Sequence, residues 1–399
     1  MMQHDKNQDA VDLTRRSFLK NSSFATFAAL MGGIPLQAAE GDAGAYGETK
    51  SSAAPPLNFG MIGCGQRGRD ILTTLATMPN GPVVGICDGY EPFAKRAKKL
   101  ALDATIYTDY KELLKNADVK GVVVATPTCL HKDIVLDALK AGKHVYCEMP
   151  LAHTVEDARV IAKAAQTHCK VNFQAGLAYR ADPQRLNVLK NLRQGAIAKP
   201  IMVRAQWHKK TSWRRTSSSP EQEKLMNWRL DKTMSTGLIG EIGIHQLDMV
   251  GMYLGAKPVS AVGFGSLIHW TQDGRDVPDT VQAVIEYPNN VRLVFDITLA
   301  NSYDGEYEVY YGTDSAVMVR GNQAWMFKEV DAPLLGWEVY ARKDAFYKEA
   351  GVVMMANATK LGAQTKEGGE LPPTEASLYK SLEAFITNSG KHGDAVEDF

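Results

Sequence analysis

The string Gly63-Cys64-Gly65-Gln66-Arg67-Gly68 has residue types and a spacing that could bind phosphate groups. It follows an apolar run, 57–62, and Asp88 comes 20 residues after its last glycine. Glycine permits a tight turn at the first position, a close approach of pyrophosphate at the second, and close helix packing at the third. The amides of the helix that follows would face the phosphates. The string therefore predicts a dinucleotide-binding turn.

Asp88 indicates which dinucleotide this turn would take. Its carboxylate is suited to the 2′ and 3′ hydroxyls of a ribose and would repel a 2′-phosphate. We therefore expect NAD in preference to NADP.

Glu241 and His245 form a second candidate pair. They stand four residues apart in a segment, 240–254, that reads as a helix, so they would share a face. A carboxylate beside an imidazole can fix its tautomer and raise its basicity, which favours His245 as a general base. Asp248 borders the same face. In the alternative interpretation His245 is a packed side chain bonded to Glu241, and Asp248 is solvated.

Composition excludes several classes of function. Lys plus Arg and Asp plus Glu number 45 each, so no charge excess points to nucleic acid or an anionic membrane. The five cysteines are odd in number and none has Cys-x-x-Cys spacing, so neither a metal site nor a disulfide framework follows. A small or uncharged partner is favoured.

The N-terminus has the layout of a twin-arginine export signal. Arg15 and Arg16 precede Ser-Phe-Leu-Lys, a weakly apolar stretch and Ala38-Ala39. That stretch is about half of the ~20 residues that span a bilayer, so no stable membrane anchor is expected. We predict a signal over 1–39, a linker over 40–56, and export of the folded chain to the periplasm or another extracytoplasmic site.

The rest of the chain divides into two α/β domains. Strand and helix patterns alternate over 57–177, which predicts a doubly wound parallel Rossmann sheet. The pattern then changes, and 178–399 is expected to be a substrate and oligomerisation domain. Its run 260–327 reads as at least five strands of an open, mainly antiparallel sheet, and 375–388 reads as a helix.

Four strings together resemble the Gfo/Idh/MocA oxidoreductases, a family named for glucose–fructose oxidoreductase, inositol dehydrogenase and rhizopine catabolism. They are the loop 63–68, Ala-Thr-Pro-Thr-Cys-Leu-His at 125–131, Cys-Glu-Met-Pro-Leu-Ala at 147–152 and Glu-Ile-Gly-Ile-His-Gln-Leu-Asp at 241–248. The resemblance implies a Rossmann domain, a second domain with an open sheet, and a substrate held between that sheet and the nicotinamide. Relatives often associate through the open sheet, which implies a homo-oligomer.

The resemblance also implies site residues. Those beside the cofactor would be Gly63, Gly65, Gln66, Arg67, Gly68, Asp88, Thr126, Pro127, His131, Glu148, Met149 and Pro150. Met149 replaces the lysine of the family's Glu-Lys-Pro pattern, and methionine has no proton to give. Glu241 replaces the family's common aspartate. His131 could instead have a capping or surface role.

Further residues are candidates for the substrate side. Tyr179 and Arg180 follow the Rossmann domain where the floor of a cleft would begin, and Tyr179 could assist His245 in proton transfer. Trp213 and Arg214 belong to a cationic and aromatic patch that could stack on a sugar or simply lie in solvent. We expect Arg180, Trp213, Arg214 and Asp248 to contact substrate.

The leading hypothesis is an NAD-dependent oxidoreductase for a secondary hydroxyl of a sugar or cyclitol, with tightly bound cofactor and His245 as the base. The first alternative is a redox-assisted glycosidase or lyase, because the chain resembles exported NAD-dependent α-N-acetylgalactosaminidases in its apolar residue at 149 and its tyrosine near 179. Those enzymes carry a Thr-His-Gly string where this chain has Glu-Ile-Gly-Ile-His, so their histidine cannot be transferred to it. The second alternative is a non-catalytic sugar- or dinucleotide-binding protein.

Overall fold

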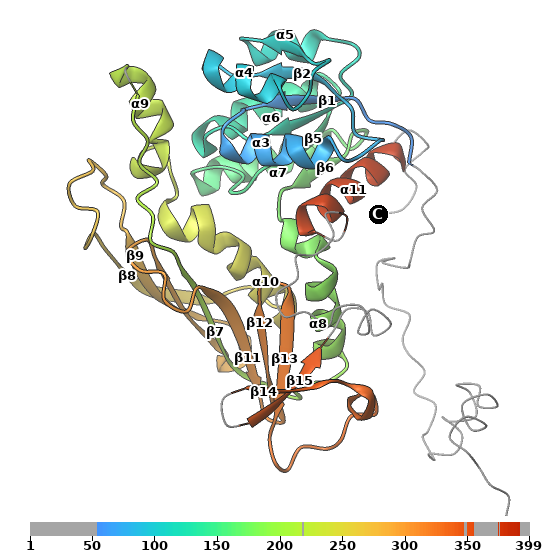
Figure 1. The fold of residues 1–399 in the computed structure, drawn as a ribbon, viewed down its shortest axis with the longest axis vertical. Coiled ribbons are helices and arrows are strands. Elements are labelled where there is room, and N and C mark those ends of the chain that lie inside the picture. Colours follow the sequence, from blue (N-terminus) through green and yellow to red (C-terminus); the bar gives the residue numbers. More distant parts are fainter. Residues whose placement is uncertain (1–53, 218, 347–348, 355–373, 375, 392–399) are drawn as a thin grey trace, which may run out of the picture. The chain divides into compact units, whose positions relative to one another are not determined.

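The computed structural model describes residues 54–217, 219–346, 349–354, 374 and 376–391. The expected signal, 1–39, and most of the linker, 40–53, lie outside these residues. The described part falls within one compact unit, 53–399. Figure 1 shows its two layers, the smaller sheet with its helices and the larger sheet.

The first sheet is parallel, with strands in the order β3-β2-β1-β4-β5-β6. The strands are β1 (Phe59–Ile62), β2 (Val83–Cys87), β3 (Thr105–Tyr107), β4 (Gly121–Val124), β5 (His144–Cys147) and β6 (Phe173–Ala175). Strands β1 and β4 are buried along their whole length, as continuous apolar runs in a parallel sheet should be. The strand order reverses between these two neighbours, and ligands of such sheets bind at the carboxyl ends there. The Rossmann prediction is confirmed.

Helices connect these strands. They are α3 (Gln66–Leu75), α4 (Glu91–Lys98), α5 (Tyr110–Lys115), α6 (His131–Lys140) and α7 (Val155–Thr167). Helix α3 buries Ile71, Leu72 and Leu75 against the sheet. Because α3 begins directly after Gly65, its first amides lie at the carboxyl end of β1.

The second sheet is mixed and mainly antiparallel, as expected, with β7 and β10 paired in parallel. Its order is β14-β15-β13-β12-β11-β7-β10-β9-β8. The strands are β7 (Pro200–His208), β8 (Ser260–Ser266), β9 (Thr280–Glu286), β10 (Arg292–Thr298), β11 (Glu306–Gly312), β12 (Ser315–Arg320), β13 (Gln323–Lys328), β14 (Lys343–Phe346) and β15 (Glu349–Met354).

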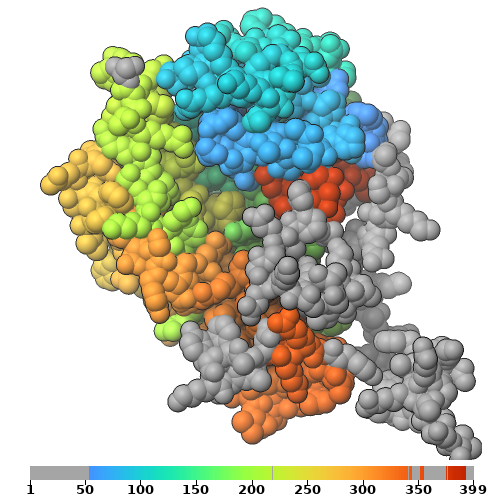
Figure 2. All heavy atoms as spheres, viewed as in Figure 1, coloured from blue at the N-terminus to red at the C-terminus, as the bar shows by residue number. Residues whose placement is uncertain are grey.

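Two helices pack on one face of this sheet. Val188 of α8 (Pro183–Arg193) and Met249 of α10 (Ile244–Leu254) join Phe295 and Ile297 of β10 in one buried cluster. Helix α9 (Pro220–Met226) has no buried residue and lies beside the Rossmann layer, as Figures 1 and 2 show. The turn Trp228–Leu230 follows it and leads back to the cavity described below.

The last described helix, α11 (Ser377–Lys391), packs against the first layer (Figure 1) and against the turn Ala178–Ala181. Phe385 is fully buried, with its ring 5.9 Å from that of Phe59 and 5.8 Å from that of Tyr146. Asn172 donates to the Phe385 carbonyl. The sequence-based boundary placed this helix in the second domain because local patterns do not show which apolar surface a distant helix will cover.

None of the described helices is both long and apolar enough to cross a membrane. Within the same residues, no group of three or more His, Cys, Asp or Glu side chains is arranged to hold a metal ion.

Candidate functional site

The turn after β1 has the shape that a dinucleotide requires. Gly63 has a φ of +92°, and a Cβ there would lie 2.6 Å from backbone atoms of Ala125. A Cβ on Gly68 would lie 2.1 Å from the Gly63 carbonyl oxygen. A Cβ on Gly65 would meet no atom of the described part of the chain within 4 Å, so this glycine faces open space there. The turn is therefore tightly packed within the protein but open where a pyrophosphate would approach.

Asp88 lies beside this turn, at the end of β2. Its carboxylate accepts hydrogen bonds from the backbone amides of Cys64 (2.7 Å) and Tyr90 (2.8 Å). Burial raises the pKa of Asp88, although these two amides oppose the shift. The carboxylate is held in place and each oxygen keeps a free lone pair, so the turn and Asp88 fit a dinucleotide.

Arg67 and Gln66, at the start of α3, have different surroundings. The Arg67 guanidinium donates from Nε to Glu148 Oε1 at 3.0 Å, and its Nη2 is also 3.0 Å from that oxygen. Burial raises the pKa of Glu148, with Arg67 opposing the shift. The Gln66 side chain donates to Asp70 on its own helix. Arg67 thus joins the turn to the segment after β5.

A cavity of about 310 Å³ extends from this point between the two layers. Side chains from the turn, from the carboxyl ends of β4 and β5, and from the second layer line it. They are Arg67, Ala125, Thr126, Thr128, His131, Glu148, Met149, Ala178, Tyr179, Trp228, Arg229, Glu241, Ile242, His245, Ser377 and Leu378. Cofactor-side and catalytic candidates thus lie together.

His245 stands in the first turn of α10. Burial, reinforced by Arg67, lowers the pKa of its imidazole to about 4, and Asp248 only partly opposes this. The imidazole is therefore neutral at pH 7, and one ring nitrogen keeps a lone pair for a proton. The Tyr179 ring lies 5.7 Å from the His245 ring, measured between centroids.

Glu241 does not orient His245 as the sequence suggested. A π-helical turn, Ile239–Gly243, precedes α10, so the two residues depart from the α-helical i, i+4 alignment. The Glu241 carboxylate instead accepts hydrogen bonds from the hydroxyls of Thr128, Ser235 and Thr236. Among the described residues it makes no hydrogen bond to His245.

Tyr179 is fixed by two charged neighbours. Its hydroxyl donates to Glu306 Oε1 at 2.9 Å, and the Arg185 guanidinium lies 4.1 Å from its ring centroid. Burial and the nearby Glu306 raise the pKa of Tyr179, so the phenol stays protonated at neutral pH.

His131 connects the segments that follow β4 and β5. Its Nδ1 lies 2.9 Å from the Pro150 carbonyl oxygen, and its Nε2 lies 3.0 Å from that of Thr126. The Met149–Pro150 peptide bond is cis. Pro127 directly precedes the short helical turn 128–130 that leads into α6. These contacts give His131 a positioning role at the cavity wall. The buried Thr126 hydroxyl oxygen has no hydrogen-bond partner among the described residues.

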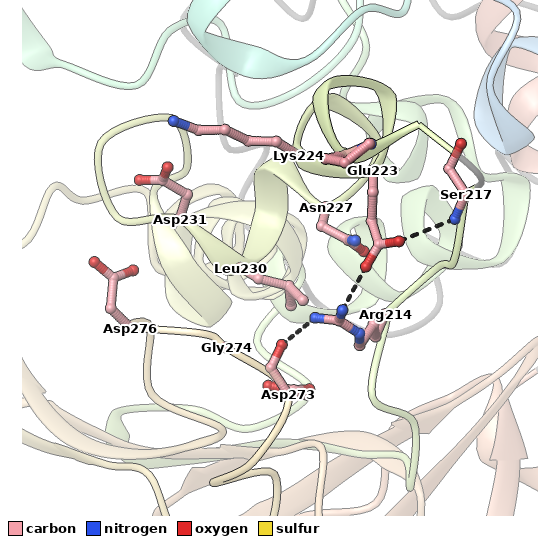
Figure 3. A pocket seen from close by; sticks show the side chains of 11 residues that line it. Arg214, Ser217, Glu223, Lys224, Asn227, Leu230, Asp231, Asp273, Gly274 and Asp276 are labelled. Atoms are coloured by element: carbon pink, nitrogen blue, oxygen red, sulfur yellow. Dashed lines mark hydrogen bonds and ion pairs between the residues drawn. The ribbon is translucent and has the colours of Figure 1, made fainter.

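The four residues expected to contact substrate are not among those that line this cavity. Arg180 forms a two-point ion pair with Asp248, with N–O distances of 2.8 and 2.6 Å. Trp213 packs against the core of the second layer. Arg214 lines a separate hollow of about 600 Å³, where it binds Glu223 and the Asp273 carbonyl (Figure 3).

The lining also contains residues that sequence reasoning missed. Arg229 and Trp228 come from the turn after α9, Thr128 from the short helical turn before α6, and Ser377 and Leu378 from α11. The aromatic and cationic pair Trp-Arg at 228–229 was the sequence feature that could have suggested a ligand site. Its distance along the chain from the nucleotide turn gives no indication that the two lie together.

Two family models match this arrangement. Residues 57–176 match the oxidoreductase family with an NAD-binding Rossmann fold, and residues 186–317 match the Gfo/Idh/MocA C-terminal domain. Inositol 2-dehydrogenase 2 of Saccharopolyspora erythraea is 31% identical over 251 residues, which are 62% of this chain and 68% of that protein. The chain belongs to the Gfo/Idh/MocA oxidoreductase family.

Other comparisons are partial or show the fold alone. Inositol 2-dehydrogenase of Salmonella typhimurium is 35% identical over 149 residues, 37% of this chain, so the match spans 44% of that relative. An oxidoreductase domain protein from Kribbella flavida aligns with a TM-score of 0.68 and 22% identity over 85% of this chain and 91% of its own. Levoglucosan dehydrogenase in complex with NADH and levoglucosan aligns with a TM-score of 0.67 and 21% identity, over 84% of this chain and 90% of its own.

Proposed function

We propose that the protein is an NAD-dependent oxidoreductase that acts on a secondary hydroxyl of a sugar or cyclitol. The observation that supports this most is one shared cavity, lined by Arg67 of the nucleotide turn, Glu148 and Met149 after β5, and His245 of α10. The named relatives, inositol and levoglucosan dehydrogenases, act on polyhydroxylated substrates of this kind.

The residues that line the cavity have different roles in the proposed reaction. When bound, NAD supplies the hydride acceptor for the carbon that carries the hydroxyl. His245 accepts the hydroxyl proton on an imidazole nitrogen, which the low pKa leaves unprotonated at pH 7. Met149 has no proton to exchange, so proton transfer depends on His245. Arg67 and Glu148 hold the turn against the segment after β5.

Formation of NADH tests this function. The NAD-loaded protein is mixed with myo-inositol, levoglucosan or hexoses, and absorbance at the NADH band is followed. We expect reduction with at least one polyol. Tightly bound NAD with no redox change for any carbohydrate would refute the proposal and favour a binding protein.

One observation favours a redox-assisted glycosidase as a second candidate. Tyr179 and Met149 line the same cavity, and the Tyr179 hydroxyl is already bonded to Glu306. Such an enzyme would release the glycone from an aryl glycoside without added NAD and would incorporate solvent deuterium into the product. If neither occurs, this candidate is removed.

We also propose that the chain is exported folded through the twin-arginine pathway with NAD already bound. The string 14–20 supports this proposal. Changing both Arg15 and Arg16 to lysine keeps the charge and should retain the protein in the cytoplasm, which cell fractionation measures. Export of this variant equal to that of the wild type would contradict the proposal.

Retention of the cofactor is a separate measurement. Mass spectrometry of the undialysed protein measures whether NAD stays bound.

The open sheet supports association of two copies. Val262, Val284 and Val294 are paired across β8, β9 and β10 and are 62%, 36% and 40% exposed, whereas neighbouring residues of β9 and β10 point into the core. We propose a homo-oligomer through this apolar row. Analytical ultracentrifugation should give the mass of two or more copies for the wild type. Val262→Asp should shift that mass toward the monomer. A monomeric wild type would contradict the proposal.

A further inference from the structure

Arg229 is a cation of the active-site cavity to which the proposed reaction gives no role. It belongs to the turn Trp228–Leu230, which follows α9 and reaches the cavity wall from the second layer. Burial lowers the pKa of its guanidinium and Glu241 opposes this, but an arginine keeps its charge at any physiological pH.

The Arg229 guanidinium has no hydrogen-bond partner among the residues that the structure describes. Its nearest acidic atom is Glu241 Oε2, 3.8 Å from Nε, which is beyond hydrogen-bond reach. Thr128, Ser235 and Thr236 donate hydrogen bonds to the Glu241 carboxylate, so Arg229 stabilises its charge across 3.8 Å without using a donor. The guanidinium donors are therefore free for a ligand.

Two aromatic rings lie beside this guanidinium. Its central carbon lies 4.4 Å from the ring centroid of Trp228 and 5.9 Å from that of Trp213. Stacking on an indole restricts the rotation of an arginine and reduces the entropy lost on binding. Arg229 is thus a charged fork at the wall of the cavity, held beside an indole and 43% exposed.

The other arginine of the lining is already engaged. Arg67 directs Nε and Nη2 to Glu148, whereas the corresponding nitrogens of Arg229 remain open. A single sugar hydroxyl would use only part of such a fork, but a carboxylate matches its two parallel donors. A ligand carboxylate would also replace the hydration that a partly buried cation loses.

We propose that Arg229 binds the carboxylate of an acidic sugar, so that this site prefers sugar acids to the matching neutral sugars. This inference rests on the proposed function and adds the substrate class. It makes Arg229 a specificity-determining residue.

Isothermal titration of the NAD-loaded protein with two matched pairs tests the inference: D-glucuronate against D-glucose, and D-galacturonate against D-galactose. We expect at least one acid to bind about 10- to 100-fold more tightly than its neutral partner. Arg229→Gln should abolish that preference, Arg229→Lys should keep part of it, and the exposed control Arg193→Gln should leave it unchanged.

Three results would overturn the inference: equal affinities within each pair, no binding of either acid, or a preference that survives in Arg229→Gln. A loss of NAD affinity in Arg229→Gln as large as its loss of affinity for the acid would also overturn the inference, because the guanidinium would then bind a dinucleotide phosphate. NADH formation with neutral sugars alone would leave the proposed function standing and refute only the acid preference. Acid binding without NADH formation from any sugar would refute the proposed function and leave the acid preference standing.

Discussion

Replacing Gly65 with alanine tests whether the turn after β1 holds a dinucleotide. The added methyl group would meet no atom of the described residues within 4 Å, and the φ of −59° at this position is open to alanine. The free energy of unfolding of the ligand-free protein should therefore change by less than about 1 kcal/mol. Any larger effect on NAD binding must come from the ligand that fills this space.

The size of that effect follows from the contacts that the methyl group would displace. A hydrogen bond to a charged group contributes about 1.5–3 kcal/mol, so the loss of one amide–phosphate contact weakens NAD binding about 10- to 100-fold. Urea denaturation measures the stability, and titration of NADH fluorescence measures the affinity.

Gly68→Ala is the matched control within the same turn. Its methyl group would lie 2.1 Å from the Gly63 carbonyl oxygen, so the backbone must move and the protein should lose about 1–3 kcal/mol or more of stability. Unchanged NAD affinity in a normally folded Gly65→Ala variant would refute the assignment of this turn.

Three further predictions concern stability and cofactor choice. Asp88→Ser should shift the preference from NAD toward NADP by about tenfold or more, measured as the ratio of dissociation constants; an unchanged ratio would show that Asp88 does not select the ribose. Phe385→Ala should cost about 3–5 kcal/mol in urea denaturation, since the ring is fully buried against Phe59 and Tyr146; a cost under about 1 kcal/mol would mean that α11 is not docked there. His245 has a pKa of about 4 in the fold against 6.5 for an ordinary histidine, so the fold favours its neutral form and loses stability as the pH falls from about 6.5 to 4. His245→Asn should lose less over that range, and parallel curves for the two proteins would contradict the shift.

The nucleotide turn could be predicted because its parts are adjacent in the chain. Gly63, Gly65 and Gly68 follow β1 and lead into α3, and Asp88 directly follows the next strand, β2. Each glycine is required by the local backbone conformation or by a close contact within the turn, so the spacing of the glycines is enough to predict the turn.

The partner of Glu241 could not be predicted in this way. The i, i+4 rule assumes an α-helix, whereas a π-helical turn contains Glu241. Its actual partner Thr128 is 113 residues away and belongs to the other layer. Contacts of that range depend on how two layers pack, which periodicity does not encode.

The place of Arg229 at the cavity and the packing partner of α11 could not be predicted for the same reason. The turn that carries Arg229 reads as an ordinary polar connection, and its place at the cavity depends on Trp213 and Trp228 beneath it. The apolar face of α11 predicted a helix but not that Phe385 would return to the first sheet.

Turnover by a His245 variant tests the central claim, that the cavity is a redox site with this imidazole as its base, most directly. On the best polyol substrate, His245→Ala should lower kcat by about 100-fold or more and leave the affinity for NAD within about twofold. His168→Ala, which changes a histidine that is not part of the lining, should leave both unchanged. Turnover by His245→Ala equal to that of the wild type would contradict the account.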